Sequence, residues 1–161
     1  MLTDLEKEIL QKTIWDNPYI PKDHMPFPKQ IDALLDFRKE LLFGGSAGGG
    51  KSDYLLMAAL QFVEQPNYNA IIFRRTYSDL SLPEGLIPRS HEWLTHTPAQ
   101  YKQDLHQWLF PSGSTLTFGY LESESHIYRY KSAAFSFIGF EELTEFPIER
   151  FYTYLFSRLR K

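Results

Sequence analysis

Residues 45–52 read Gly45-Ser46-Ala47-Gly48-Gly49-Gly50-Lys51-Ser52, a complete G-x-x-x-x-G-K-[ST] phosphate loop. The glycines allow the backbone to turn tightly with its amides pointing inward, so that the loop and the start of the following helix form a cradle for an anion. In such a loop the Lys51 ammonium reaches the β- and γ-phosphates, and the Ser52 hydroxyl is a ligand for Mg²⁺. The spacing therefore predicts that all eight residues bind ATP together with Mg²⁺.

The flanking residues have the pattern that a phosphate loop requires. Residues 40–43, Glu-Leu-Leu-Phe, form a short apolar run that predicts a buried strand directly before the loop. Residues 53–64 predict a helix, because apolar side chains recur on one stripe: Leu55, Leu56, Ala59, Leu60 and Val63. The order of strand, loop and helix favours a nucleotide site over the alternative, a flexible glycine-rich turn.

A second informative stretch is an apolar run over residues 135–140 that ends in Glu141 and Glu142. A buried strand that delivers two acids at its carboxyl end suits an ATPase: the first acid holds Mg²⁺, usually through water, and the second polarises the attacking water. We therefore predict Glu141 and Ser52 as metal ligands and Glu142 as the catalytic base. Aspartate is usual at the first position, but Mg²⁺ keeps several waters, which absorb the extra methylene of glutamate. A solvated acidic turn is the alternative.

Composition limits the remaining possibilities. The 161 residues are enough for one domain with a core, and at 43% hydrophobic and 16% aromatic the chain does not have the composition of a disordered protein. The lack of cysteine excludes a disulfide framework. The charged start and the lack of a long apolar run predict a cytoplasmic protein without membrane contact. A net charge of −3 gives no global attraction to nucleic acid, so any contact with DNA must come from a local patch.

The other segments predict an α/β fold with a mainly parallel sheet covered by helices. Residues 1–28 predict an amphipathic helix over 1–15 and an extended proline-rich connector over 17–28, and residues 29–161 form the main domain. Within that domain we predict helices at 30–38 and 148–159, a strand at 70–73, loop and short helix at 76–100, a hairpin of 107–110 with 115–118, and a short helix at 123–130.

Several stretches, in order and spacing, resemble the large terminase subunit of tailed bacteriophages from about residue 26 to the end. They are residues 43–52 (FGGSAGGGKS), 72–77 (IFRRTY), 110–114 (FPSGS), 118–120 (FGY), 137–146 (FIGFEELTEF) and 157–160 (SRLR). The resemblance implies the N-terminal ATPase domain of a DNA-packaging motor, with a P-loop fold of the additional-strand, RecA-like type. Such a domain hydrolyses ATP, with Mg²⁺, to drive double-stranded DNA into a viral procapsid.

The resemblance also implies partners and further domains. The partners are double-stranded DNA, a small terminase subunit, the portal, and other copies of the chain in a ring. Large subunits normally continue into a coupling motif and a metal-dependent nuclease domain, and this sequence stops at Lys161 before either. We therefore expect a truncated product, a split subunit or an expressed fragment without nuclease activity. The alternatives are a helicase-like ATPase and a nucleotide-binding interaction module with little turnover.

The resemblance implies a role for one glutamine. Gln30 stands where the family places a residue that reads adenine, and its amide can both donate and accept hydrogen bonds, as the adenine edge requires. The alternative is an ordinary polar residue in the first turn of a helix.

An arginine that stabilises charge on the transferring phosphoryl group, often from a neighbouring subunit, is also implied. It commonly lies in an Arg-Gly step before the acidic strand, where this chain has Lys131-Ser132, and lysine lacks the bidentate fork of arginine. Arg129 is therefore the first candidate and Arg158 the second. Arg74 and Arg75 close the strand at 70–73 on the side where α/β sheets bind ligands, and they either contact phosphate or DNA or pair with surface acids.

Overall fold

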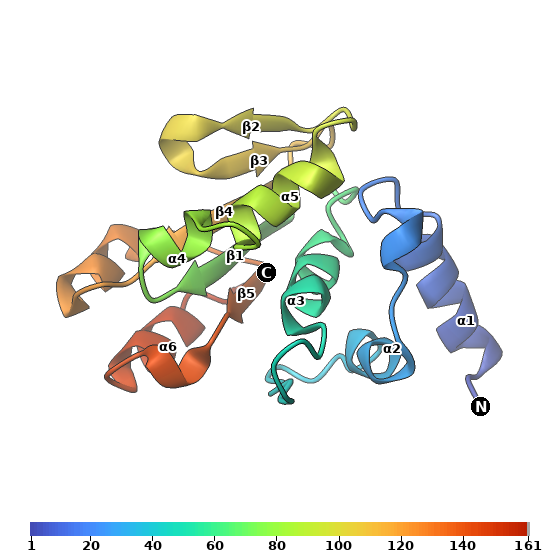
Figure 1. Cartoon of the computed structure of the whole chain (residues 1–161), viewed down its shortest axis with the longest axis horizontal. Coiled ribbons are helices and arrows are strands. Elements are labelled where there is room, and N and C mark those ends of the chain that lie inside the picture. The colour runs from blue at the N-terminus through green and yellow to red at the C-terminus, as the bar shows by residue number, and fades with distance from the viewer. Residues whose placement is uncertain (161) are drawn as a thin grey trace.

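The structure, a computed structural model, describes residues 1–160 (Figure 1). Within these residues one sheet has the strand order β2-β3-β4-β1-β5. The strands are β1 (Asn69–Arg74), β2 (Gln100–Lys102), β3 (Gln107–Leu109), β4 (Thr115–Tyr120) and β5 (Phe137–Phe140). β1 lies between β4 and β5 and runs parallel to both, whereas β3 runs antiparallel to β2 and β4. The chain is therefore a mixed α/β protein.

The sheet is mixed, which corrects the prediction of a mainly parallel sheet. The predicted hairpin is present, with Leu109 opposite Thr115, and it sets β3 antiparallel to β4. The loop between these strands is closed by a hydrogen bond of 3.0 Å from Phe110 N to Ser114 O. A loop this short cannot carry a chain back to the start of a neighbouring strand, which a parallel connection requires. Among the five strands, parallel pairing joins β1 to β4 and β1 to β5, and segments that contain helices separate each pair in the sequence.

Helices cover both faces of the sheet because successive side chains of β1 point to opposite sides. Ala70 and Ile72 belong to one buried cluster with α3 (Lys51–Leu60) and α5 (Leu86–Leu94). Ile71 and Phe73 belong to a second cluster with α6 (Arg150–Phe156) and the 3₁₀ helix Glu124–Tyr130. These four central side chains of β1 are 0% exposed. The other helical segments in this part of the chain are α4 (Tyr77–Ser81) and the 3₁₀ helices Gln103–Leu105 and Leu143–Glu145.

The N-terminal residues pack beside α3, away from the sheet (Figure 1). The predicted first helix is α1 (Asp4–Leu10), continued by a π-helical turn (Gln11–Trp15), and the connector holds the 3₁₀ helix Lys22–His24. Leu10 and Ile14 are fully buried in the same cluster as α3. Asn17, which is 2% exposed, donates a hydrogen bond of 3.0 Å to Leu60 O. The N-terminal residues thus share a core with α3.

Several predicted helices have different bounds in the structure. α6 spans Arg150–Phe156, inside the predicted range 148–159. α2 spans Pro28–Leu34 and ends four residues before the predicted end at residue 38. α3 begins at Lys51 and ends at Leu60, before the predicted end at residue 64. The chain turns at residues 61–64. There the carbonyl of Val63 accepts hydrogen bonds from the hydroxyls of Ser112 and Ser114. Tertiary contacts of Val63 with the hairpin loop thus accompany the end of α3.

The predicted strand at residues 40–43 is not formed. These residues have no regular structure, and Leu42 is 81% exposed. They line a cavity of about 640 Å³ together with residues of β5. A strand needs a hydrogen-bonded neighbour to satisfy its backbone, and within residues 1–160 no strand pairs with residues 40–43. Shortly before β5, Phe135 forms an isolated parallel bridge with Leu159.

Candidate functional site

The glycine-rich loop turns directly into α3. Gly48 and Gly50 have φ angles of 73° and 72°, a conformation that side chains disfavour. A Cβ on Gly50 would also lie 2.7 Å from Nε2 of Gln30, so glycine is required there for two reasons. Residues 44–49 are exposed, and α3 is ten residues long. The loop thus leaves the amino end of a long helix open to an anion.

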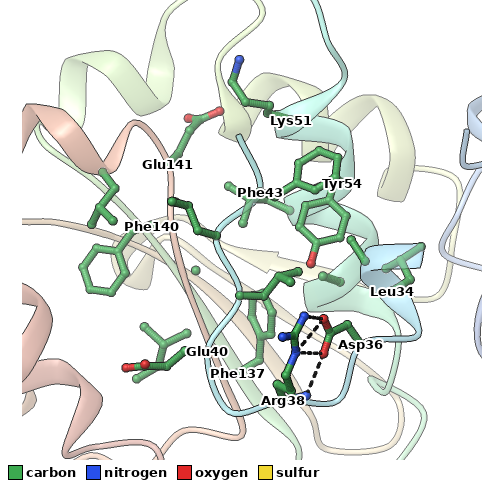
Figure 2. A pocket seen from close by; sticks show the side chains of 18 of the residues that line it. Leu34, Asp36, Arg38, Glu40, Phe43, Lys51, Tyr54, Phe137, Phe140 and Glu141 are labelled. Carbon is green, nitrogen blue, oxygen red and sulfur yellow. Dashed lines mark hydrogen bonds and ion pairs between the residues drawn. The ribbon is translucent and has the colours of Figure 1, made fainter. Parts of the chain in front are cut away.

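Lys51 folds back over the loop. Its Nζ donates hydrogen bonds of 3.0 Å to the carbonyl of Gly45 and 2.8 Å to that of Ser46. Within residues 1–160, no carboxylate forms an ion pair with Lys51. Figure 2 shows Lys51 and Glu141 at the same end of the cavity, with Asp36 and Arg38 at the other. Loop carbonyls are weak partners for an ammonium compared with an anion, so Lys51 is free to turn to phosphate.

Glu141 lies directly against the loop. Its Oε1 accepts a hydrogen bond from the hydroxyl of Ser52, and its backbone N donates one of 2.9 Å to Phe73 O. The second bond continues the parallel pairing of β5 with β1, in which Phe140 stands opposite Phe73. The pairing of β5 with β1 therefore places Glu141 beside the start of α3. The structure brings the two residues predicted as metal ligands into contact.

Glu142 is placed differently from Glu141. It has a φ of 51°, is exposed, and begins the 3₁₀ helix Leu143–Glu145. Glu142 lines the same cavity as Lys51. The turn after β5 thus places the two acids differently: Glu141 contacts Ser52, and Glu142 is exposed.

Gln30 is a buried residue of α2 that supports the loop. It is 2% exposed, its Nε2 donates a hydrogen bond of 2.8 Å to Gly50 O, and its Oε1 accepts one of 2.8 Å from Phe27 N. These bonds close the first turn of α2 and attach that helix to the residue before Lys51. The glutamine is therefore beside the predicted nucleotide loop, with its amide engaged by the backbone.

The two arginines proposed for charge stabilisation lie outside this arrangement. The exposed guanidinium of Arg129 lies 5.5 Å from the ring centroid of Tyr120. Arg158 donates to the carbonyl of Lys131 and lies 5.5 Å from the ring centroid of Tyr154. Neither residue lines the cavity. The structure does not bring them to the loop of the same chain.

Arg74 is the arginine beside the acid. Its Nε is 3.9 Å from Oε2 of Glu141, and its Nη2 is 3.8 Å from Oε2 of Glu145. These distances give charge attraction but no hydrogen bond. Its Nε and Nη1 are buried without a hydrogen-bond partner. From the sequence, Arg74 was expected to contact either phosphate or DNA or else surface acids. Its position at the end of a buried strand was the feature that pointed to it. Its neighbour Arg75 instead donates to Leu121 O.

Asp53 is an anchor that the sequence analysis missed. It follows Ser52 directly, accepts a hydrogen bond from Nη1 of Arg89 in α5, and lies 3.5 Å from Nδ1 of His24. His24 belongs to the connector, so Asp53 ties the start of α3 to two other segments. An acid in the first turn of a helix also interacts favourably with the helix dipole. These contacts hold the base of the glycine-rich loop in place.

At the far end of the cavity, Asp36 and Arg38 pair with each other. Hydrogen bonds from Arg38, one of them 2.9 Å, lower the pKa of Asp36 to about 2. Burial raises the pKa of Tyr54 to about 12, so its phenol stays neutral, and its ring stacks on Phe43 at 4.3 Å between centroids. Glu40 also lines the cavity and accepts a hydrogen bond of 3.0 Å from the hydroxyl of Tyr152.

The fold and site define a mixed α/β protein in which a glycine-rich loop and helix start face an acid at the end of a parallel strand. Residues 42–161 match the family described as terminase large subunit, T4likevirus-type, N-terminal. The chain belongs to this family, which confirms the resemblance. Comparisons with curated proteins and with solved structures gave no match.

Membership of this family points to a role in phage DNA packaging, with DNA and packaging components as partners in general terms. In the described part of the chain, no helix combines the length and apolar character needed to cross a membrane.

Proposed function

We propose that this chain binds ATP with Mg²⁺ at residues 45–52 and hydrolyses it, as the ATPase domain of a motor that moves double-stranded DNA into a procapsid. The contact between Ser52 and Glu141 is the observation that carries the proposal. It joins the last residue of the loop to the first acid of the pair, as an ATPase needs. Lys51 and the loop amides neutralise phosphate charge.

The donor set suits Mg²⁺. A serine hydroxyl and a carboxylate are hard oxygen ligands, and Mg²⁺ is usually bound by one or two protein groups together with water and substrate phosphates. Within residues 1–160, no group of three or more acids or histidines is placed to hold a metal. Ser52 and Glu141 would therefore hold the ion, which when bound neutralises charge on the phosphates. Both oxygens would then face the ion and no longer each other.

We assign the general base to Glu142. Glu142 is exposed and lines the cavity, so it has access to water, whereas the carboxylate of Glu141 accepts a hydrogen bond from Ser52. A base must come within hydrogen-bond reach of the water that it orients, and catalytic contacts often tighten only once the substrate is bound. Glu142 orients or deprotonates the attacking water in this proposal.

We also propose that the chain has a P-loop fold of the RecA-like, additional-strand type. The parallel pairing of β1 with β4 and β5 supports this proposal, as does the glycine-rich loop directly before α3.

In the assembled motor, we propose that copies of the chain form a ring in the host cytoplasm, with a small subunit and the portal as partners. Arg129 is exposed and distant from its own loop, as an arginine that serves a neighbouring subunit would be. We propose no nuclease activity for this chain.

A second candidate function is nucleotide binding with little turnover. The position of Arg129 and Arg158 favours it, because neither reaches the loop of the same chain. Both functions share the loop and differ only in whether the active site is complete within one chain.

Calorimetric titration of ATP, with and without Mg²⁺, tests the shared step, and a steady-state phosphate-release assay on the same sample tests turnover. Binding with turnover supports the ATPase, and binding without turnover supports the second candidate. Absence of ATP binding by the folded chain would overturn both.

A further inference from the structure

Arg74 and Glu141 lie at the carboxyl ends of β1 and β5, which are adjacent and parallel. Phe73 stands opposite Phe140, and the next residues along the two strands are Arg74 and Glu141. This is the carboxyl edge, where open α/β sheets bind their ligands. The Arg74 side chain is 17% exposed and that of Glu141 is 13% exposed, so both are largely removed from water.

The guanidinium of Arg74 has donors that the chain does not use. Its distances of 3.9 Å to Glu141 and 3.8 Å to Glu145 exceed a hydrogen bond, and its Nε and Nη1 are buried without a partner. The Arg150–Glu124 pair shows the contrast: Arg150 Nη1 donates to the carboxylate at 2.6 Å. An arginine that served only to hold Glu141 would be expected to bond as Arg150 does. Buried N–H groups rarely stay unpaired, so Arg74 is prepared for an acceptor from outside the chain.

The surroundings of Arg74 identify that acceptor. The carboxylate next to it is bonded on its other oxygen to Ser52, the residue that ends the glycine-rich loop. A phosphate chain in the loop has its inner groups on the loop amides, and its terminal group extends toward the side of the metal ligands. Arg74 stands on this side, across Glu141 from Ser52. The planar guanidinium fork matches phosphate oxygens, because it donates two parallel hydrogen bonds.

We propose that Arg74 binds the terminal phosphate of a nucleoside triphosphate held by the loop of its own chain, and so distinguishes ATP from ADP. This rests on the proposed function, because it requires that nucleotide occupy the loop. With phosphate bound, Arg74 would exchange its loose pairing with Glu141 for hydrogen bonds to the phosphate. Arg74 acts within one chain and is distinct from an arginine supplied by a neighbour.

Calorimetry with a non-hydrolysable ATP analogue and with ADP, both with Mg²⁺, tests the proposal. Arg74→Ala should lower the affinity for the analogue by about tenfold or more, the scale of a lost charge-assisted hydrogen bond. The affinity for ADP should stay within about twofold of the wild-type value. Arg74→Lys should recover part of the loss because it keeps the charge without the fork. Arg150→Ala, which removes an arginine–glutamate pair elsewhere, should change neither affinity.

A measurement on the wild-type protein covers the case in which Arg74→Ala does not fold. The NMR signal of the Arg74 Nε–H, assigned with Arg74→Lys, should move when the analogue is added and stay nearly in place with ADP. Equal weakening of both nucleotides, or an unmoved signal with bound analogue, would overturn the proposal and leave Arg74 as a support of Glu141. A wild-type chain that binds neither nucleotide would instead refute the proposed function.

Discussion

The hydroxyl of Ser52 donates a hydrogen bond to Glu141 across 89 positions of sequence. The bond joins the start of α3 to the end of β5, and so it sets an acid against the glycine-rich loop. Glu141 also stands beside Arg74, which places a cation on the other side of the same carboxylate. Removal of any one of these three side chains should therefore change how the other two bind a nucleotide.

Lys51→Ala should abolish ATP binding or weaken it at least tenfold, roughly the effect of losing a charge-assisted contact to phosphate. The fold should survive, because the hydrogen bonds of Lys51 go only to loop carbonyls. Calorimetry with ATP measures the first effect and thermal unfolding the second. Lys102→Ala, which removes an exposed lysine on β2, serves as the control. Unchanged ATP affinity in a folded Lys51→Ala variant would disprove the assignment of the loop.

Replacing the two acids in turn should separate their roles. Glu142→Gln should keep Mg-ATP binding and lower the rate of hydrolysis by about 10²-fold or more, the scale of a lost general base. Glu141→Gln should mainly alter the Mg²⁺ dependence, because it changes the group that contacts Ser52. Phosphate release measured across a Mg²⁺ titration distinguishes them. Normal hydrolysis by Glu142→Gln together with an inactive Glu141→Gln would mean that the base is one residue earlier.

Gln30→Ala should lower the free energy of unfolding by about 1–3 kcal/mol, because the partly buried hydrogen bonds from the Phe27 N–H and to the Gly50 carbonyl are both lost. Chemical denaturation measures this loss. The adenine contact stays a prediction, which the ratio of ATP to GTP affinity tests in the same variant. The preference for ATP should fall if the amide reads adenine. An unchanged preference would restrict Gln30 to its contacts with the backbone.

Gly119→Ala should destabilise the fold by about 1–3 kcal/mol, the usual range for overpacking a core. A Cβ at this position would lie 2.6 Å from Cε1 of Phe73 and 2.9 Å from the hydroxyl of Tyr130. Gly44→Ala is the matched control, since a Cβ there would meet nothing within 4 Å. Urea denaturation of both variants gives the comparison. Equal stability of Gly119→Ala and wild type would contradict this packing.

The isolated chain should be mostly monomeric in dilute solution and turn over ATP very slowly. An arginine from a neighbouring subunit contributes about 10³–10⁵ in rate in comparable phosphoryl-transfer enzymes, and Arg129 is exposed where a neighbour could receive it. Turnover per chain should rise with protein concentration, or when the rest of the motor is added with procapsid and DNA. Arg129→Ala should remove this rise with nearly unchanged nucleotide affinity.

Sedimentation in parallel with the rate assay tests this prediction. A fast rate that is independent of concentration, in samples that contain only monomer, would show that the active site is complete within one chain.

Patterns between close neighbours in the sequence predicted the elements well. The glycine spacing identified the loop, the apolar stripe identified α3, and the Pro-Ser-Gly-Ser turn identified the hairpin, because each depends on residues a few positions apart. Helix ends were less accurate: α2 ends at Leu34, before the predicted residue 38. The predicted strand at residues 40–43 failed because a strand depends on a neighbour that no local pattern can supply.

The sequence by itself determined which chemical groups the site contains: the glycines that permit the turn, Lys51, Ser52 and the acidic pair. Only the tertiary structure decided how they meet. The parallel pairing of β1 with β5 sets Arg74 beside Glu141, and it directs Glu141, but not Glu142, toward Ser52. Such contacts depend on the register between strands distant in the chain, because a shift of one residue turns every side chain to the opposite face of the sheet.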